Sequence, residues 1–320
     1  MIPRRQFMSG LASVPVVLTA GRGLASSPMQ IVVTTGMIAD AARQIAGEDA
    51  EVRALMGPGV DPHAYRQTRS DIVAMGRADA VLWHGLYLEA QMETFLEELQ
   101  SRVPVTAVAE TLSRDLLLAH EDYEGRFDPH VWMVPSLWKE VVIAVRDALT
   151  DLRPEAAERF AANTRAHLSD IDRIGAYADQ VLASVPQEQR VLVTAHDAFN
   201  YFGAAYDYEV LGIQGISTES EAGLQRIGDL VDLLVDRGVR AVFVESSVSD
   251  RNVRALIEGA TAQGHEVAIG GELFSDAMGA PGTYEGTYIG MIDHNATVIA
   301  RALGGTAPER GIDGLLGAGG

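Results

Sequence analysis

The sequence predicts an α/β protein of two lobes, each a mostly parallel sheet flanked by helices, joined by a single long backbone helix. Two observations support this fold class. Short β-branched runs alternate with longer amphipathic segments, which is the pattern of a parallel sheet covered by helices. Two such sets of runs lie on either side of a long segment with the composition of one helix.

The first set of runs, within residues 28–150, predicts the N-terminal lobe. An amphipathic helix over 37–46 follows the first strand, and further helical patterns precede the later strands. The predicted strands are 30–35, 52–56, 80–84 and 103–108. Their alternation with helices favours a parallel sheet covered by helices.

The connecting segment, residues 151–188, predicts one long helix over 154–185. Proline stands at its start, where its missing N–H costs nothing, and Gly175 is the only weak helix former of note inside it. At 1.5 Å per residue these 32 residues would span roughly 48 Å, enough to run along both lobes.

The second set of runs predicts a C-terminal lobe over 189–305. Its predicted helices are 223–236 and 252–263, and its predicted strands are 190–194, 209–213, 241–245 and 266–270. The last residues, 306–320, are rich in glycine and alanine and predict a flexible tail.

The first 25 residues have the three parts of a secretory signal peptide: arginines, an apolar stretch and small residues. The pair Arg4-Arg5 resembles a twin-arginine signal, and the ordinary Sec route is the alternative. Polar and helix-breaking residues interrupt the apolar stretch, which is too short for a membrane span. We expect cleavage near Ala25 and a periplasmic, monomeric protein that does not itself span the membrane.

The composition is acidic and free of cysteine. Against 44 Asp and Glu stand 25 Lys and Arg, so the formal charge is −19, and loss of the signal's three arginines makes it −22. Such a surface repels a phosphate backbone, which argues against nucleic-acid binding. Without a thiolate, any metal must be held by histidine or carboxylate side chains.

The tripeptide Asp-Pro-His occurs twice and ends at His63 and at His130. Proline fixes its own φ and pushes the preceding aspartate into an extended conformation, so each histidine is presented from a stiff loop. One copy alone would be read as a turn followed by a surface histidine. Two copies, each near a predicted strand-to-helix transition, favour a ligand role for both histidines.

Three further residues of the second lobe follow predicted strands. His196 follows the first of these strands, Glu245 ends the third and Asp276 follows the fourth. Open α/β sheets bind ligands at the carboxyl ends of their strands. With His63 and His130, three imidazoles and the carboxylate of Asp276 suit one zinc ion or another divalent metal such as manganese. Glu245 is a candidate ligand, an acceptor for an imidazole N–H, or a general base.

Taken together, these stretches resemble the metal-binding solute-binding proteins of ABC transporters for zinc and manganese. The matching segments are 59–65, 127–132, 193–199, 244–249, 273–279 and 287–295. The resemblance implies two α/β lobes joined by one rigid helix, one ion per chain in the cleft, and a permease as partner. It also implies that His63, His130, His196 and Asp276 occupy the four ligand positions.

The same resemblance bears on the choice of metal. Histidine at the third ligand position, His196, favours zinc, with manganese next. Many zinc-specific members carry a long loop rich in histidine and acidic residues, whereas this chain has only a short acidic segment around His120. The chain is therefore expected to bind and deliver a metal and to catalyse no reaction.

Two alternatives use the same residues. A zinc hydrolase would keep three protein ligands, leave the fourth position to water and use Glu245 as general base. An adhesin or a metallochaperone would use the same scaffold without a permease. A fourth protein ligand at Asp276 would close the position that a hydrolase needs.

Overall fold

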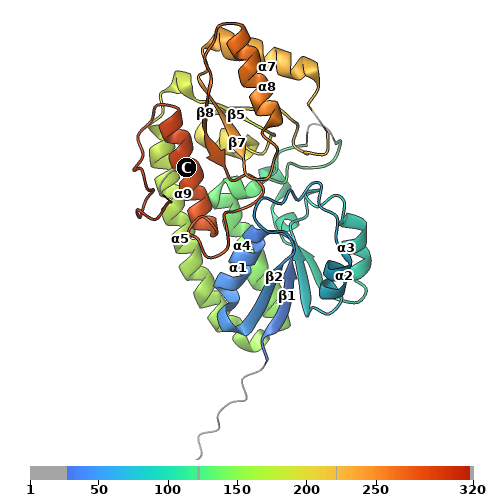
Figure 1. Cartoon of the computed structure of the whole chain (residues 1–320). Helices are drawn as coiled ribbons and strands as arrows, with labels where there is room; N and C mark the ends of the chain where they lie inside the picture. The colour runs from blue at the N-terminus through green and yellow to red at the C-terminus, as the bar shows by residue number, and fades with distance from the viewer. Residues whose placement is uncertain (1–26, 121–122, 221, 318–320) are drawn as a thin grey trace, which may run out of the picture.

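The computed structural model describes residues 27–120, 123–220 and 222–317. Two α/β lobes lie one above the other, and a long helix runs along one side of both (Figure 1). This arrangement confirms the predicted fold class. The predicted signal peptide, residues 1–25, lies outside the described residues. Among the helices of the described residues, none is long and apolar enough to cross a membrane.

The N-terminal lobe is built on a four-stranded parallel sheet of order β2-β1-β3-β4. The strands are β1 (Met29–Val33), β2 (Ala50–Ala54), β3 (Ala80–Trp83) and β4 (Val105–Ala107). Helix α1 (Gly36–Ala46) covers one face, and α2 (Arg69–Met75) and α3 (Glu93–Leu99) cover the other (Figure 1). Neighbouring residues of β1 point to opposite faces, so Val33 packs in the core on the α1 side and Val32 in the core on the α2 and α3 side.

The connection between the lobes contains two helices. Helix α4 (Pro135–Leu152) packs against α5 (Ala157–Ala183), and α5 contacts α1 in one lobe and α9 in the other. The predicted helix over 154–185 is therefore present, but its first three residues, Pro154–Ala156, form a 3₁₀ turn. At 27 residues, α5 is about 40 Å long. Helix α4 is not among the elements that the sequence pattern predicts.

The C-terminal lobe contains two pairs of parallel strands. β5 (Val191–Thr194) pairs with β6 (Glu209–Gly212), and β7 (Ala241–Glu245) pairs with β8 (Ala268–Leu273). The helices are α6 (Asn200–Tyr206), α7 (Leu224–Arg237), α8 (Arg251–Ala262) and α9 (Tyr288–Ala302). Helices α7 and α8 pack together, while α9 lies beside α5 (Figure 1).

Strand β8 is the largest departure from the predicted strand boundaries. The predicted strand over 266–270 begins two residues later and continues to Leu273, with a bulge opposite Val242 and Phe243. The strand continues through Gly270 and Gly271. The absence of side chains at these two positions lets α9 pack closely against the strand. A Cβ at Gly270 would lie 2.9 Å from Ala302 Cβ, and one at Gly271 would lie 2.5 Å from Val298 Cγ1. The extension brings the end of β8 to the edge where Asp276 follows.

The residues after α9 run back along that helix as far as residue 317. The Ile312 N–H donates to the carboxylate of Asp293, Asp313 pairs with Arg173 on α5, and Leu316 is buried. These contacts place residues 312–316 of the tail against α9 and α5. The flexibility of the tail over 306–320 stays a prediction.

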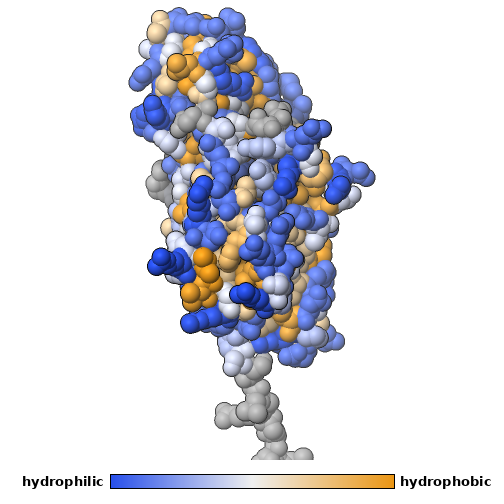
Figure 2. Space-filling view, turned by 90° about the vertical axis from the view of Figure 1, so that its right-hand side faces the viewer, coloured by the Kyte–Doolittle hydropathy of each residue, from blue (hydrophilic) through white to orange (hydrophobic). Residues whose placement is uncertain are grey.

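The face that carries α2 and α3 is mostly hydrophilic, with small apolar groups between the polar side chains (Figure 2). Ile72 and Val73 on α2 are among the exposed large apolar residues. The acidic composition of the chain is thus reflected in a polar surface.

Candidate metal centre

The four residues predicted to bind metal come together between the lobes. One ligand atom from each of His63, His130, His196 and Asp276 lies within 4.8 Å of all the others, and all four residues are buried. The Nε2 atoms of His63 and His130 are 3.3 Å apart. The carboxylate oxygens of Asp276 lie 3.4 Å from His130 Nε2 and 3.3 Å from His196 Nε2. The four donors therefore surround a space of the size of one ion.

Each lobe contributes two of these residues from loops. His63 lies between β2 and α2, and His130 lies just before α4. His196 follows β5 directly and Asp276 follows β8, so both stand at the carboxyl ends of parallel strands. The site depends on both lobes, because neither lobe alone offers more than two of the donors.

The second Asp-Pro-His loop is tightly held. Asp128 Oδ1 accepts from the backbone N–H of His130 at 2.9 Å and lies 2.7 Å from His130 Nδ1, which turns Nε2 toward the cluster. The ring of His84 is hydrogen-bonded to the Pro129 carbonyl at 2.8 Å. The buried indole of Trp132 packs edge-on against His130 and donates to the carbonyl of Ser275 at 2.7 Å, across the lobe boundary.

The first loop uses its aspartate differently. Asp61 Oδ1 accepts from the backbone N–H of His63 at 2.8 Å, and the hydroxyl of Thr218 in the other lobe donates to Oδ2 at 2.5 Å. Tyr65, two residues beyond His63, donates to Asp71 on α2 at 2.8 Å. The carboxylate of Asp61 thus joins the His63 backbone to the opposite lobe.

Glu245 lies behind His196. Its Oε1 accepts from the His196 backbone N–H at 2.9 Å and its Oε2 is 2.5 Å from His196 Nδ1. Nε2 of His196 therefore faces Asp276. Of the three roles that the sequence left open for Glu245, this geometry matches the acceptor of an imidazole N–H, which orients a ligand histidine.

Charges inside the cluster set the protonation of the metal-free site. Burial lowers the pKa of His130, but Asp128 and Asp276 outweigh it and raise the pKa to about 9. Asp276 and Glu245 likewise overcome burial and raise the pKa of His196 well above its usual value. Burial opposes ionisation of Asp276, yet the neighbouring imidazoles hold its pKa well below the usual range. Two imidazolium groups, His130 and His196, therefore lie against the carboxylates of the metal-free cluster.

His63 behaves in the opposite way. Burial, helped by the imidazoles of His130 and His196, lowers its pKa to about 3 in spite of the nearby charge of Asp276. No carboxylate is bonded to its ring within the described residues. His63 is thus already neutral and ready to donate a lone pair at neutral pH.

The donor set fits a divalent metal ion. His196 Nε2 and Asp276 Oδ1 are buried and lack a hydrogen-bond partner among the described residues, which is costly unless another group satisfies them. Three imidazole nitrogens and one carboxylate oxygen suit zinc in four-coordinate geometry and are acceptable to other borderline divalent metals.

Sequence reasoning missed the residues that support this cluster from the opposite lobe. Asn200 donates to Asp128 Oδ2 at 3.1 Å, and the hydroxyl of Tyr201 donates to the Asp128 carbonyl at 2.9 Å. Both lie on α6, some 70 residues away from the loop that they hold. The repeated motif could have drawn attention to Asp128, but no local pattern marks its partners.

Two α/β lobes, a rigid helix along both and four buried donors at their boundary define a class: solute-binding proteins that hold a metal ion between two lobes. Comparison with known proteins places the chain within this class. The family model described as zinc-uptake complex component A, periplasmic, matches residues 31–302, and the chain belongs to this family.

Curated relatives support the same conclusion. The chain is 44% identical over 286 residues to the manganese-binding lipoprotein MntA of Bacillus subtilis, covering 89% of this chain and 92% of MntA. It is 46% identical over 273 residues to the zinc-binding protein TroA of Treponema pallidum, covering 85% and 88%. The solved structure of TroA superposes with a TM-score of 0.84 over 86% of this chain and 99% of TroA.

These two relatives are named as metal-binding proteins, and the family is described as a component of a zinc-uptake complex. The prediction of a binding protein rather than an enzyme is therefore confirmed, and the hydrolase alternative is not supported. Both carboxylate oxygens of Glu245 are bonded to His196, as expected of a residue that orients this histidine.

Proposed function

We propose that the protein binds one divalent transition-metal ion per chain in the periplasm through His63, His130, His196 and Asp276, and delivers it to an ABC transporter permease. The observation that carries the proposal is the buried cluster of three imidazoles and one carboxylate shared by two lobes. A site divided between lobes gives the permease a means of release, because separating the lobes removes half of the donors. Family membership supports the transport role.

Zinc is the proposed cargo, with manganese next. Four protein donors satisfy the tetrahedral geometry of zinc, and three of them are the imidazoles that it commonly uses. Manganese belongs to the metals that prefer more oxygen ligands. One similar relative is named for manganese and another for zinc, so the identity of the ion has to be measured on this chain.

The protein is proposed to act as a monomer after export by the twin-arginine or the Sec route. The cluster draws all four donors from one chain, so metal binding needs no second copy.

A competitive titration of the metal-free protein with Zn(II) and Mn(II) at neutral pH tests the binding proposal. We expect one tight equivalent of zinc and weaker binding of manganese. Asp276→Ala should weaken binding strongly, because it removes a donor between His130 and His196. His265→Ala is the matched control, since its ring bonds to the Val239 carbonyl away from the cluster. Failure of the wild-type chain to bind either metal stoichiometrically would refute the proposal.

Delivery requires a separate test with the permease. The metal-loaded protein should stimulate ATP hydrolysis by the reconstituted transporter and lose its ion to the vesicle interior. A metallochaperone or an adhesin on the same scaffold would bind the ion and leave both transporter readouts unchanged.

A further inference from the structure

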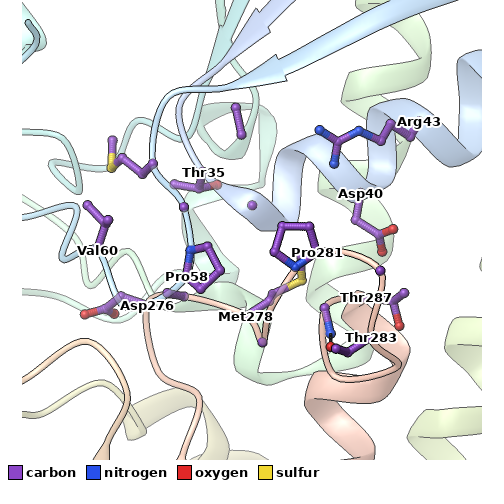
Figure 3. Close-up of a pocket in the computed structure, with 18 residues that line it drawn as sticks. Thr35, Asp40, Arg43, Pro58, Val60, Asp276, Met278, Pro281, Thr283 and Thr287 are labelled. Carbon is purple, nitrogen blue, oxygen red and sulfur yellow. Dashed lines mark hydrogen bonds between the residues drawn. The ribbon is translucent and has the colours of Figure 1, made fainter.

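The segment that follows Asp276 is not packed on all sides. Residues 277–287, between Asp276 and the start of α9, border a cavity of about 420 Å³ whose other wall belongs to the N-terminal lobe (Figure 3). The Asp276 side chain itself is buried, and besides the imidazoles of the cluster the hydroxyl of Ser247 is its one bonded donor among the described residues, at 3.4 Å. The position of Asp276 therefore depends on what holds the residues before it.

Asn295 on α9 holds the backbone just before Asp276. Its side-chain oxygen accepts from the N–H of Phe274 at 2.9 Å, and its side-chain nitrogen donates to the carbonyl of the same residue at 2.7 Å. The buried Asn295 thus bonds Phe274 as the opposite residue of a neighbouring strand would. The carbonyl of Ser275 accepts from the indole of Trp132 at 2.7 Å. Three hydrogen bonds therefore fix the two residues that precede Asp276.

Tyr288 attaches the start of the same helix to the segment of His130. Its hydroxyl donates to the carbonyl of Trp132, two residues after His130, at 2.9 Å. Its ring is fully buried and stacks on Trp138 of α4, with 5.4 Å between the centroids and 19° between the planes. Its backbone N–H donates to the carboxylate of Asp40 on α1 at 2.9 Å. The start of α9 is thus bonded to the N-terminal lobe beside His130.

Tyr288 and Asn295 lie on one face of α9. They are seven residues apart, which is two helical turns and about 10 Å along the axis. One helix therefore holds the segment of His130 through one residue and the segment of Asp276 through the other. Support of this kind restricts the distances between ligand atoms, and these distances help to decide which ion fits.

We propose that α9 is a brace that fixes the separation of His130 and Asp276, with Tyr288 and Asn295 as positioning residues, and that this brace favours zinc over manganese. The inference rests on the proposed function, because it concerns the selectivity of the same cluster. Zinc takes four ligands at short distances, whereas manganese prefers more oxygen ligands in octahedral geometry. A braced Asp276 has little freedom to move aside and admit further ligands.

Two substitutions loosen the brace at its two ends. Asn295→Ala removes both bonds to Phe274, and Tyr288→Phe removes only the hydroxyl bond to the Trp132 carbonyl. Competitive titrations with Zn(II) and Mn(II) give the ratio of the two affinities. We expect Asn295→Ala to weaken zinc binding by about tenfold, the lower end of the range for residues that support a metal ligand, and to weaken manganese binding much less. Tyr288→Phe should lower the ratio by a few fold.

Two matched controls lose the same kinds of bond away from the cluster. Asn163→Ala removes an amide bond to the Ile45 carbonyl, and Tyr208→Phe removes the bond of a buried hydroxyl to the Leu182 carbonyl. Both controls should keep the wild-type ratio of zinc to manganese affinity, even where they lower the melting temperature.

The outcomes separate the brace from the binding function. An equal loss of zinc and manganese affinity in Asn295→Ala would mean that this residue supports only the fold, and would overturn the proposal. Tyr288→Phe keeps the buried ring, so an unchanged ratio in this variant would overturn the proposal even if Asn295→Ala did not fold. If the wild-type chain binds neither metal stoichiometrically, the proposed function itself fails.

Discussion

The two Asp-Pro-His loops share three residues and differ in what their aspartates hold. Asp128 accepts from both the backbone and the ring of His130, whereas Asp61 accepts only from the backbone of His63 and uses its other oxygen for Thr218 in the opposite lobe. The two loops therefore differ in the protonation of their histidines as well as in geometry. The pKa of His130 rises to about 9, and that of His63 falls to about 3.

A buried network of hydrogen bonds supports the second loop. The ring of His84 bonds to the Pro129 carbonyl, and the backbone N–H of His84 donates to Glu89 at 2.8 Å. Glu89 also accepts from Thr34 at 2.6 Å. Identical tripeptides thus have different structural roles. The second copy fixes its ligand, His130, within its own lobe, and the first joins the loop of His63 to the opposite lobe.

The largest expected effect comes from the support of the second loop. Burial raises the pKa of Glu89 from 4.5 to about 7, although four N–H and O–H donors oppose the rise. The folded protein therefore holds a proton that the unfolded chain releases between these values. The resulting stability is complete below pH 4.5 and is lost as the pH rises through 7, a change of roughly 3 kcal/mol.

Glu89→Gln should remove this pH dependence. Thermal melts of the metal-free protein between pH 5 and pH 7 measure it, with Glu93→Gln, on the neighbouring helix α3, as a control that keeps the wild-type slope. The same dependence of melting temperature on pH in wild type and Glu89→Gln would show that Glu89 is ionised throughout, and would contradict the prediction.

The second prediction compares the two aspartates directly. Asp128→Asn keeps an oxygen that can accept from His130 but removes the negative charge behind its ring, and a change to such a partner weakens metal binding by about 10- to 100-fold. Asp61→Asn can keep the bond to the His63 backbone through its amide oxygen and loses the acceptor for Thr218, which is worth about 1 kcal/mol, or roughly fivefold in affinity. Competition with a zinc chelator measures both. Equal losses in the two variants would mean that the loops support their histidines in the same way.

This comparison also shows what the sequence could predict. The alternation of strands and helices predicted both lobes and the long helix, and the repeated motif with two residues at strand ends predicted the four clustered donors. Helix α4 was missed because no strand follows it, so the alternation gave it no place. Contacts such as Thr218 with Asp61 join residues 157 positions apart, and no local pattern encodes them.

The third prediction concerns protons released when metal binds. At pH 7 the raised pKa values keep His130 and His196 protonated in the metal-free cluster, so binding of an ion at their Nε2 atoms should release close to two protons. Affinity should then rise with pH at least until the pKa of His130, about 9, is passed. Calorimetry in buffers of different ionisation enthalpy counts these protons.

Asp128→Asn sharpens this count. Without the Asp128 charge the pKa of His130 falls, so the variant should release about one proton fewer at pH 7. A wild-type release below one proton would show that the cluster is already deprotonated, and that the carboxylates do not raise the two histidine pKa values as inferred.

The smallest effect belongs to the bond that distinguishes the first loop. Thr218→Val leaves Asp61 Oδ2 without its donor from the opposite lobe, and loss of one hydrogen bond costs about 1 kcal/mol. Asp128 and His130 are untouched, so we expect faster release of zinc into chelator by a few fold and an unchanged proton count. Thr261→Val, on α8, serves as the matched control. A contact that only joins the lobes alters how long the ion stays bound and not how many protons it displaces. A change in proton release in Thr218→Val would therefore mean that this bond alters the pKa values of the ligands.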